Sequence, residues 1–270
     1  MRPVTAWGEP LSKHVVGKST ALNQVLAASK QLASSDAAVL ITGEIGSGKE
    51  LLARVIHSES SRSNKNFVKV DCITTPRELL ERELFGFAKG AFDGAVSDKT
   101  GWLELANRGT LFVNEIQRFP LDLQLKLVRA LTRGECEPLG STRIIRIDVR
   151  LMATARQPPQ RWSVANAPTQ NLERWIGGNR LQQDLYEQFK GSIAVPPLRE
   201  RREDIPLLVR YFVEKFARRA DKDIEIIEPE TMDALLNYDW PGNVGQLESF
   251  IQRSVILTDG SKLRAPLDKL

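Results

Sequence analysis

A short glycine-rich stretch that ends in a lysine and a glutamate carries the strongest chemical signal in the sequence. Its eight residues are Gly43, Glu44, Ile45, Gly46, Ser47, Gly48, Lys49 and Glu50. Glycines allow successive backbone N–H groups to turn inward and form a concave anion site, and the lysine can reach the outer phosphates of a nucleotide. The stretch therefore predicts nucleotide binding. A plain glycine turn between a strand and a helix is the alternative.

The segments on either side predict the elements that would hold this stretch. Residues 37–42 are apolar and partly β-branched, as is typical of a buried strand. After Lys49, apolar residues recur at helical spacing between 51 and 56. A strand, a glycine loop, a lysine and a helix form the context of a phosphate-binding P-loop, in which the helix N-terminus adds positive potential. Glu50 is a departure, because many P-loops place Ser or Thr there as a magnesium ligand.

Alternating strand and helix patterns beyond the P-loop predict the fold class. Helix patterns lie at 20–32, 77–86 and 121–131, and strand patterns lie at 67–70, 109–113, 144–148 and 149–154. Such alternation predicts an α/β fold with a mainly parallel sheet covered by helices on both faces. It also places the nucleotide at the carboxyl ends of the strands. Residues 89–101 are predicted to form a glycine-rich surface loop.

A change of pattern at Pro196 and Pro197 predicts a second, smaller unit. Beyond these prolines the apolar stripes are wholly helical, which indicates a small helical lid. The predicted organisation is a lead-in at 1–13, an α/β nucleotide-binding subdomain at 14–196, a helical lid at 197–258 and a tail at 259–270.

Composition narrows the class of protein. The chain has 270 residues, of which 41% are hydrophobic and 27% charged, as in ordinary globular proteins. A net charge of +4 is too slight to indicate a nucleic-acid surface. Two cysteines, Cys72 and Cys136, suit a reducing compartment. No apolar run approaches a membrane span, and the start has no secretory signal pattern, so we expect a cytoplasmic protein with no membrane partner.

Several motifs in a fixed order resemble the AAA+ central domain of bacterial sigma-54-dependent transcriptional activators, the enhancer-binding proteins. Besides the P-loop, the matching pieces lie at 83–86, 89–95, 108–115, 197–201 and 240–244. In this family a glutamate after the P-loop lysine is usual. The resemblance implies a P-loop AAA+ fold, ATP as the bound nucleotide, and transcription regulation. It also implies an RNA polymerase sigma factor as partner, and a ring formed with itself or with related AAA+ subunits.

The loop that contacts the sigma factor in this family has a changed residue here. The family's GAFTGA corresponds to Gly90, Ala91, Phe92, Asp93, Gly94 and Ala95. The aromatic Phe92 is kept, but Asp93 replaces the threonine. A carboxylate at a docking surface must be desolvated or paired, so we expect weakened engagement of sigma-54. A tolerated surface substitution is the alternative.

The resemblance assigns the hydrolytic residues to positions that differ in this chain. Glu115 matches the residue that prepares the attacking water and is the candidate catalytic group. Asn114 stands where the family has the magnesium-binding acid, and an amide is a weaker ligand that cancels no charge. No metal ligand is therefore assigned with certainty, and Asn114 is the candidate for Mg²⁺ arriving with the nucleotide. Ala155 and Arg156 occupy the sensor I pair, and Gly245 replaces the sensor II arginine of the lid.

The arginine fingers that the family supplies to a neighbouring subunit are also replaced. The matching stretch is 181–188, and the two finger positions hold Gln182 and Gln188. An arginine finger is worth on the order of 10³–10⁵ in rate, and a neutral amide cannot supply its charge. Arg174 and Arg180 are nearby candidates to replace it.

Together these residues predict a nucleotide-binding pseudo-ATPase that uses ATP, or another purine nucleotide, to set its assembly. One alternative is an active ATPase that remodels sigma-54 RNA polymerase through compensating residues. Another is a non-catalytic interaction scaffold with a vestigial P-loop. Specific DNA binding is not expected from this chain alone, because no helix-turn-helix pattern follows the lid. Residues 157–178 could cover a ring interface or form a loop.

Overall fold

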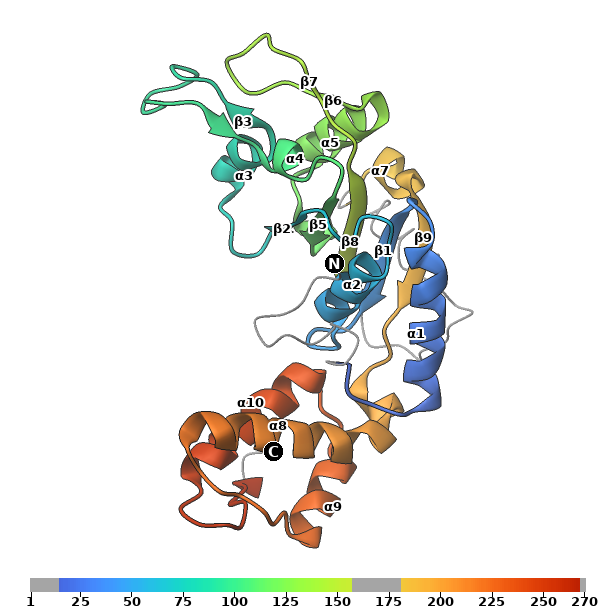
Figure 1. Ribbon diagram of the computed structural model, residues 1–270, viewed down its shortest axis with the longest axis vertical. Coiled ribbons are helices and arrows are strands. Elements are labelled where there is room, and N and C mark those ends of the chain that lie inside the picture. The colour runs from blue at the N-terminus through green and yellow to red at the C-terminus, as the bar shows by residue number, and fades with distance from the viewer. Residues whose placement is uncertain (1–14, 157–180, 268–270) are drawn as a thin grey trace.

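A five-stranded parallel sheet forms the centre of the computed structural model, which describes residues 15–156 and 181–267. The predicted lead-in at 1–13, the segment 157–178 and the candidate arginines Arg174 and Arg180 lie outside these residues. The strand order is β2-β5-β8-β1-β9 (Figure 1). The strands are β1 (Ala38–Gly43), β2 (Phe67–Asp71), β5 (Thr110–Asn114), β8 (Arg150–Arg156) and β9 (Phe189–Ala194). The predicted α/β class is confirmed.

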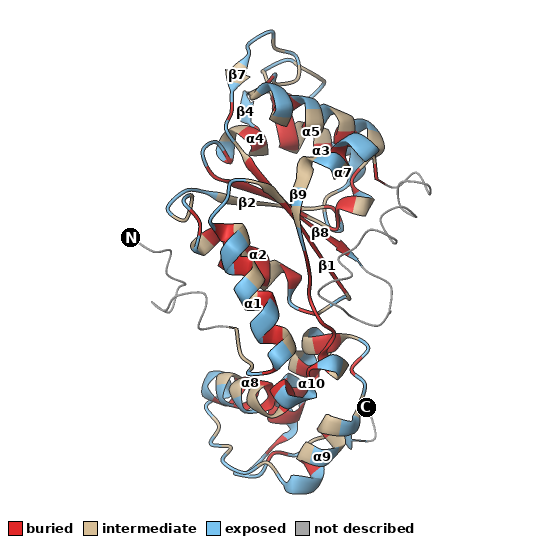
Figure 2. Cartoon of the chain, turned by 90° about the vertical axis from the view of Figure 1, so that its right-hand side faces the viewer, coloured by how far each residue is buried: buried red, intermediate tan, exposed pale blue. Residues whose placement is uncertain are grey.

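Alternation of side chains along the strands explains why helices cover both faces of this sheet. In β1, Leu40 packs on one face, whereas Val39 and Ile41 pack on the other, and all three are fully buried. Figure 2 shows buried residues concentrated in the strands between the helices. The helices of the Leu40 face are α3 (Arg77–Phe85), α4 (Trp102–Leu105), α5 (Leu121–Arg133) and α7 (Gln183–Gln188). The helices of the other face are α1 (Thr20–Ala33) and α2 (Lys49–Ser58).

Two small antiparallel ladders project at the end of the molecule far from the lid (Figure 1). The first pairs β3 (Gly86–Phe87) with β4 (Lys99–Thr100), and the second pairs β6 (Glu135–Cys136) with β7 (Ile145–Arg146). The predicted loop at 89–101 is therefore wrong at its end, where residues 99 and 100 pair with β3. The predicted strand at 144–148 is reduced to two residues, because only these find partners in β6.

The edge strand β9 and the helix α7 before it were not predicted. Lys190, Gly191 and Ser192 interrupt the apolar pattern of β9, which hides the strand from periodicity. The structure explains the glycine, because a Cβ on Gly191 would lie 2.5 Å from Leu32 Cδ2 in α1. Close packing of α1 on this strand thus requires a residue without a side chain.

The predicted helical lid follows the sheet. It opens with two 3₁₀ turns, η3 (Leu198–Glu200) and η4 (Arg202–Asp204), and continues in α8 (Ile205–Ala220), α9 (Pro229–Asn237) and α10 (Asn243–Leu257). Trp240 is fully buried at its centre and donates its indole N–H to the Leu235 carbonyl at 2.8 Å. Leu263 also belongs to this core, which therefore extends beyond residue 258. None of the helices in the described ranges is long and apolar enough to cross a membrane.

One buried carboxylate joins the lid to the sheet domain. Asp204, at the start of α8, is fully buried. It accepts hydrogen bonds from the backbone N–H groups of Lys18 and Ser19, at 2.6 and 2.8 Å, and from the Ser19 hydroxyl at 2.7 Å. Ser19 is the N-cap of α1. The first turn of the lid and the first turn of α1 are therefore held by the same side chain.

Candidate nucleotide-binding site

The glycine stretch lies where β1 ends and α2 begins, at a cavity of about 550 Å³ between the sheet domain and the lid. Gly46 and Gly48 have φ angles of 71° and 103°, in the left-handed region that favours glycine. A Cβ on Gly46 would lie 2.2 Å from the carbonyl oxygen of Gly242 in the lid. The loop can therefore lie against the lid only because this residue is glycine.

The lysine of the stretch is buried at this cavity. Lys49 is 7% exposed, and its Nζ donates to the carbonyl oxygens of Gly43 and Glu44, both at 2.9 Å. Glu115 Oε1 lies 3.7 Å away. Burial lowers the pKa of Lys49 below its usual value, although the Glu115 carboxylate opposes this shift. The cation thus has neutral acceptors that an entering phosphate group can replace.

Asn114 and Glu115 stand at the end of β5 and both contact Thr154 of the neighbouring strand. The Thr154 hydroxyl donates to Asn114 Oδ1 at 2.7 Å and accepts from the backbone N–H of Glu115 at 2.9 Å. Glu115 has a φ of 58°, and its carboxylate accepts from Gln117 Nε2 at 2.6 Å. Thr154 was not assigned to the site from the sequence. Its place beside Asn114 follows from the strand register, in which the preceding Ala153 pairs with Val113 in β5.

The two sensor I positions lie differently. Ala155 is fully buried in the core on the α5 side of the sheet and does not line the cavity. Arg156 is exposed and lines the cavity with Lys49 and Glu115. The end of β8 thus places a guanidinium beside the lysine of the P-loop.

Glu50 lies at the rim of the cavity and is already paired. Its carboxylate accepts from Lys69 Nζ at 2.8 Å and from Arg54 Nη2 at 2.9 Å. Partial burial would raise the pKa of Glu50, but the bonds from Lys69 and Arg54 leave it below the usual value. Glu50 therefore stays ionised and is neutralised by its own neighbours.

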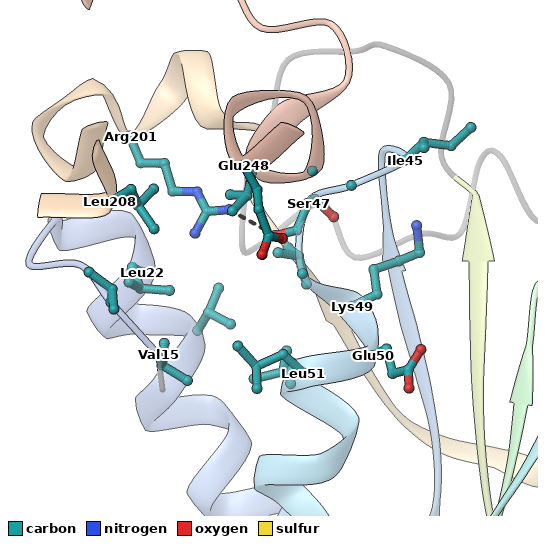
Figure 3. A pocket seen from close by; sticks show the side chains of 18 of the residues that line it. Val15, Leu22, Ile45, Ser47, Lys49, Glu50, Leu51, Arg201, Leu208 and Glu248 are labelled. Carbon is teal, nitrogen blue, oxygen red and sulfur yellow. Dashed lines mark hydrogen bonds between the residues drawn. The ribbon is translucent and has the colours of Figure 1, made fainter. Parts of the chain in front are cut away.

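The other side of the cavity is largely apolar. Val15, Leu22 and Leu208 lie across the view from Lys49 and Glu50 in Figure 3, and Leu51 lies between them. Tyr211, Phe212 and Val244 of the lid also line the cavity. An apolar compartment next to a phosphate-binding loop suits a flat nucleobase, whose rings avoid water there. Sequence analysis did not identify these residues as part of the site, because they come from segments far apart in the chain.

Three arginines follow Pro196 and Pro197, and two of them contact the P-loop. Arg199 donates two hydrogen bonds to the Glu44 carboxylate, at 2.9 and 2.7 Å. Arg201 is 5% exposed and donates from Nη2 to the Ser47 carbonyl at 2.8 Å (Figure 3). Arg202 pairs instead with the exposed Asp239. The lid thus holds the loop through guanidinium groups, and burial lowers the pKa of Arg201.

Asn243, at the start of α10, adds a third link between lid and loop. It has a φ of 53°, a conformation that asparagine tolerates better than most residues. Its Oδ1 accepts from Leu198 N at 2.7 Å, and its Nδ2 donates to the Ile45 carbonyl at 2.9 Å. Gly245 N donates to the Gly46 carbonyl at 3.2 Å. Gly245 lines the cavity without a side chain, and a Cβ there would make only an ordinary contact of 3.5 Å.

The two finger positions do not line the cavity. Gln188 ends α7, and the next residue, Phe189, pairs with Ala38 at the beginning of β1. The P-loop follows the other end of β1, so Gln188 lies near the end of the sheet opposite the P-loop.

The predicted sigma-contact loop lies between β3 and β4, far from the cavity (Figure 1). Gly90 N donates to the Ala95 carbonyl at 2.8 Å and closes the loop. The Phe92 ring packs edge-on against Phe87, with centroids 4.8 Å apart, and the Arg82 guanidinium lies 3.7 Å above its centre. Asp93 and Gly94 are exposed, and Ala91 packs against Gly140.

Two known protein families match this chain, one over the sheet domain and the other over the lid. Residues 15–193 match the family described as "Sigma-54 interaction domain", and residues 199–267 match "AAA+ ATPase lid domain". The chain is 44% identical over 254 residues to the formate hydrogenlyase transcriptional activator FhlA of Escherichia coli K12. It is 42% identical over 247 residues to the transcriptional regulatory protein ZraR of the same organism. These alignments cover 94% and 91% of this chain but 35% and 53% of the relatives, so the chain spans about a third to a half of their length.

Solved structures of NtrX from Brucella abortus share the fold. The complex of NtrX with ADP matches with a TM-score of 0.83 and 34% identity, covering 98% of this chain and 56% of that one. The complex of NtrX with ATP matches with a TM-score of 0.82 and 35% identity, covering 95% of this chain and 54% of that one.

Proposed function

Since the chain belongs to the sigma-54 interaction domain family and continues into an AAA+ lid, we propose that it regulates transcription by binding ATP, with hydrolysis weak or absent. One observation carries this proposal. The phosphate-binding loop and Lys49 are complete at the cavity, whereas the adjacent strand-end position holds Asn114, a neutral amide already bonded to Thr154. The site thus has the groups for holding phosphates and lacks an acid at that position.

Nucleotide binding is supported from both sides of the cavity. The P-loop offers backbone N–H groups and the Lys49 ammonium to phosphates, and the apolar side suits a purine ring. NtrX, which shares this fold at 34–35% identity, has been solved with ADP and with ATP. ATP is therefore the nucleotide we propose for this chain, and a related purine triphosphate would fit the same chemistry.

Weak hydrolysis is supported by the groups that would face the transferring phosphoryl. Phosphoryl transfer needs an oriented water and cations that neutralise the charge building on the phosphate. Glu115 is in place beside Lys49 and could orient a water. The finger positions Gln182 and Gln188 carry no charge. Losing a finger alone lowers the rate by on the order of 10³ or more.

The same family membership supports a partner and an assembly. We propose that nucleotide binding sets a ring made with copies of itself or with related AAA+ subunits. The projecting loop 90–95 would then contact an RNA polymerase sigma factor, with Asp93 weakening engagement of sigma-54. Binding to specific DNA sequences is not part of the proposed activity of residues 1–270.

The test measures ATP binding, phosphate release and assembly on one preparation. Calorimetry with ATP should show binding, and steady-state phosphate release should be far below that of a family member with Asp at position 114 and arginines at positions 182 and 188. Sizing by light scattering should show a larger species when ATP is present. Turnover comparable to that relative would favour the active ATPase, which remodels polymerase. Absence of ATP binding would favour a scaffold with a vestigial P-loop.

A further inference from the structure

The acidic groups at the cavity are all engaged with other residues. Among the described residues, the cavity is lined by three acids, Glu50, Glu115 and Glu248. Glu50 is paired with Lys69 and Arg54, and Glu248 accepts from Lys215 Nζ at 2.7 Å on the lid side. Glu115 accepts from Gln117 and faces Lys49. None of these carboxylates is left with an uncompensated charge for a cation.

The position next to Glu115 also does not fit a magnesium ion. Mg²⁺ is a hard cation that demands near-octahedral oxygen ligands and is usually held by at least one carboxylate. Asn114 Oδ1 instead accepts the Thr154 hydroxyl at 2.7 Å, and an amide oxygen brings no negative charge. The residues present therefore do not fit the ion that the fold family implies.

Positive side chains gather on the phosphate side of the same cavity. Lys49, Arg118 and Arg156 all line it. Arg118 and Arg156 are exposed, and neither forms an ion pair with an acid in the part of the chain that the structure describes. Arg156 is close enough to Lys49 for its charge to add to the lowering of the lysine pKa. Glu115 compensates only Lys49, at 3.7 Å, so the two exposed guanidinium groups leave an excess of positive charge that favours a polyanion there.

We propose that this cavity binds a nucleoside triphosphate without Mg²⁺, because Arg156 and Lys49 neutralise the phosphate charge that the ion would otherwise neutralise. Arg156 replaces the ion as a diffuse planar cation that donates several hydrogen bonds to phosphate oxygens. Asn114 is neutral, whereas a carboxylate at the same position would repel a metal-free triphosphate. This inference rests on the proposed function, since it assumes that ATP enters the cavity.

The first experiment compares ATP binding by the full chain with excess Mg²⁺ and with EDTA, using calorimetry. The two dissociation constants should agree within about threefold, less than 1 kcal/mol of difference. Tightening by Mg²⁺ of more than about tenfold would overturn the inference while leaving the proposed function intact. Absence of ATP binding in both solutions would overturn the proposed function and the inference together.

Two variants at the cavity and one matched control test whether Arg156 and Asn114 account for metal-free ATP binding. In EDTA, Arg156→Gln should weaken ATP binding about tenfold, as expected for losing a charged hydrogen bond. Arg143→Gln changes the same residue type at an exposed position away from the cavity and should leave the dissociation constant unchanged. Asn114→Asp should weaken binding in EDTA and recover it with Mg²⁺, so that a metal dependence appears. If Arg156→Gln and Arg143→Gln behave alike, Arg156 does not hold the phosphates.

Discussion

The junction between the P-loop and the lid is built from buried polar contacts, whereas the loop 90–95 at the far end is held by half-exposed aromatic and cationic ones. At the junction, Asn243 and Arg201 are at most 5% exposed and bond directly to the backbone of the P-loop. In the far loop, the half-buried Phe92 rests on Phe87 and beneath Arg82. The two regions therefore differ in the free energy needed to rearrange their contacts.

The contrast indicates which of the two regions can change shape on binding. A buried donor or acceptor that loses its partner costs about 1–3 kcal/mol, so the junction has one favourable geometry. A stacked ring at the surface can exchange Phe87 and Arg82 for groups of a partner at little cost, because such contacts are worth about 0.5–1.5 kcal/mol. The junction at the P-loop is thus pre-formed, and the loop 90–95 is adaptable.

The largest effect is expected at the phosphate side of the cavity. Lys49→Ala should weaken ATP binding by about a hundredfold, because it removes the buried ammonium from the P-loop. The midpoint of thermal unfolding should stay close to that of the native chain. Calorimetry measures the first quantity and circular dichroism the second. A loss smaller than about threefold would mean that the phosphates bind elsewhere.

The next effect is a loss of stability at the junction. Asn243→Ala leaves the buried N–H of Leu198 without a partner and removes a part-buried bond to the Ile45 carbonyl. We expect the free energy of unfolding to fall by about 2–3 kcal/mol in urea titration. Asn237→Ala, an exposed residue of the same type at the end of α9, should change it by less than about 0.5 kcal/mol. Equal effects of the two variants would contradict a rigid junction.

A smaller loss of stability is expected at the far loop. Phe92→Ala removes contacts with Phe87 and Arg82 and should lower the free energy of unfolding by about 1 kcal/mol. Binding of labelled sigma factor, followed by fluorescence anisotropy, should nevertheless be lost, because Phe92 belongs to the loop 90–95 that contacts the sigma factor in the proposed function. If binding persists while stability falls by several kcal/mol, Phe92 serves the fold and not the partner.

Asp93 should affect binding alone. Asp93→Thr removes an exposed carboxylate that must lose water on docking, so sigma-54 should bind about threefold to tenfold more tightly. The free energy of unfolding should change by less than about 0.5 kcal/mol. Asp259→Thr, an exposed acid beyond α10, is the matched control and should alter neither quantity. Unchanged sigma-54 binding in Asp93→Thr would identify the aspartate as a tolerated surface residue.

The smallest expected effect is a pH dependence of stability at His57, in the helix that follows the P-loop. His57 is 5% exposed in α2, with Nδ1 2.9 Å from the Thr110 hydroxyl, and burial lowers its pKa. In the unfolded chain, histidine becomes protonated as the pH falls below about 6.5. The folded His57 stays neutral at that pH because burial lowers its pKa. Stability should therefore be complete above about pH 6.5 and decline as the pH falls through the lowered value. Urea titrations at several pH values should show a weaker decline in His57→Gln.

Sequence analysis predicted the elements whose signals are local. The P-loop was clear because glycine, lysine and their flanks act within one short segment, and β1 and β5 were clear because each contains a run of three or more apolar residues. The strand β9 could not be predicted from its own residues, because its Gly191 is required by close packing against Leu32 in the distant helix α1. Thr154 and Asn243 were also missed as site residues. Thr154 meets Asn114 because β8 and β5 are neighbours in the sheet, and Asn243 meets Ile45 because the lid docks on the P-loop. Neither arrangement can be inferred from one segment of the sequence.

The buried Asp204 limits how the lid can move. Its carboxylate takes three hydrogen bonds from Lys18 and Ser19, so a swing of α8 alone would strip a desolvated anion of all its donors. Rotation about the two prolines before the lid is therefore not free. A lid displacement that keeps these bonds must carry α1 with it, sliding over β9 at Gly191, which is a shear motion rather than a hinge opening.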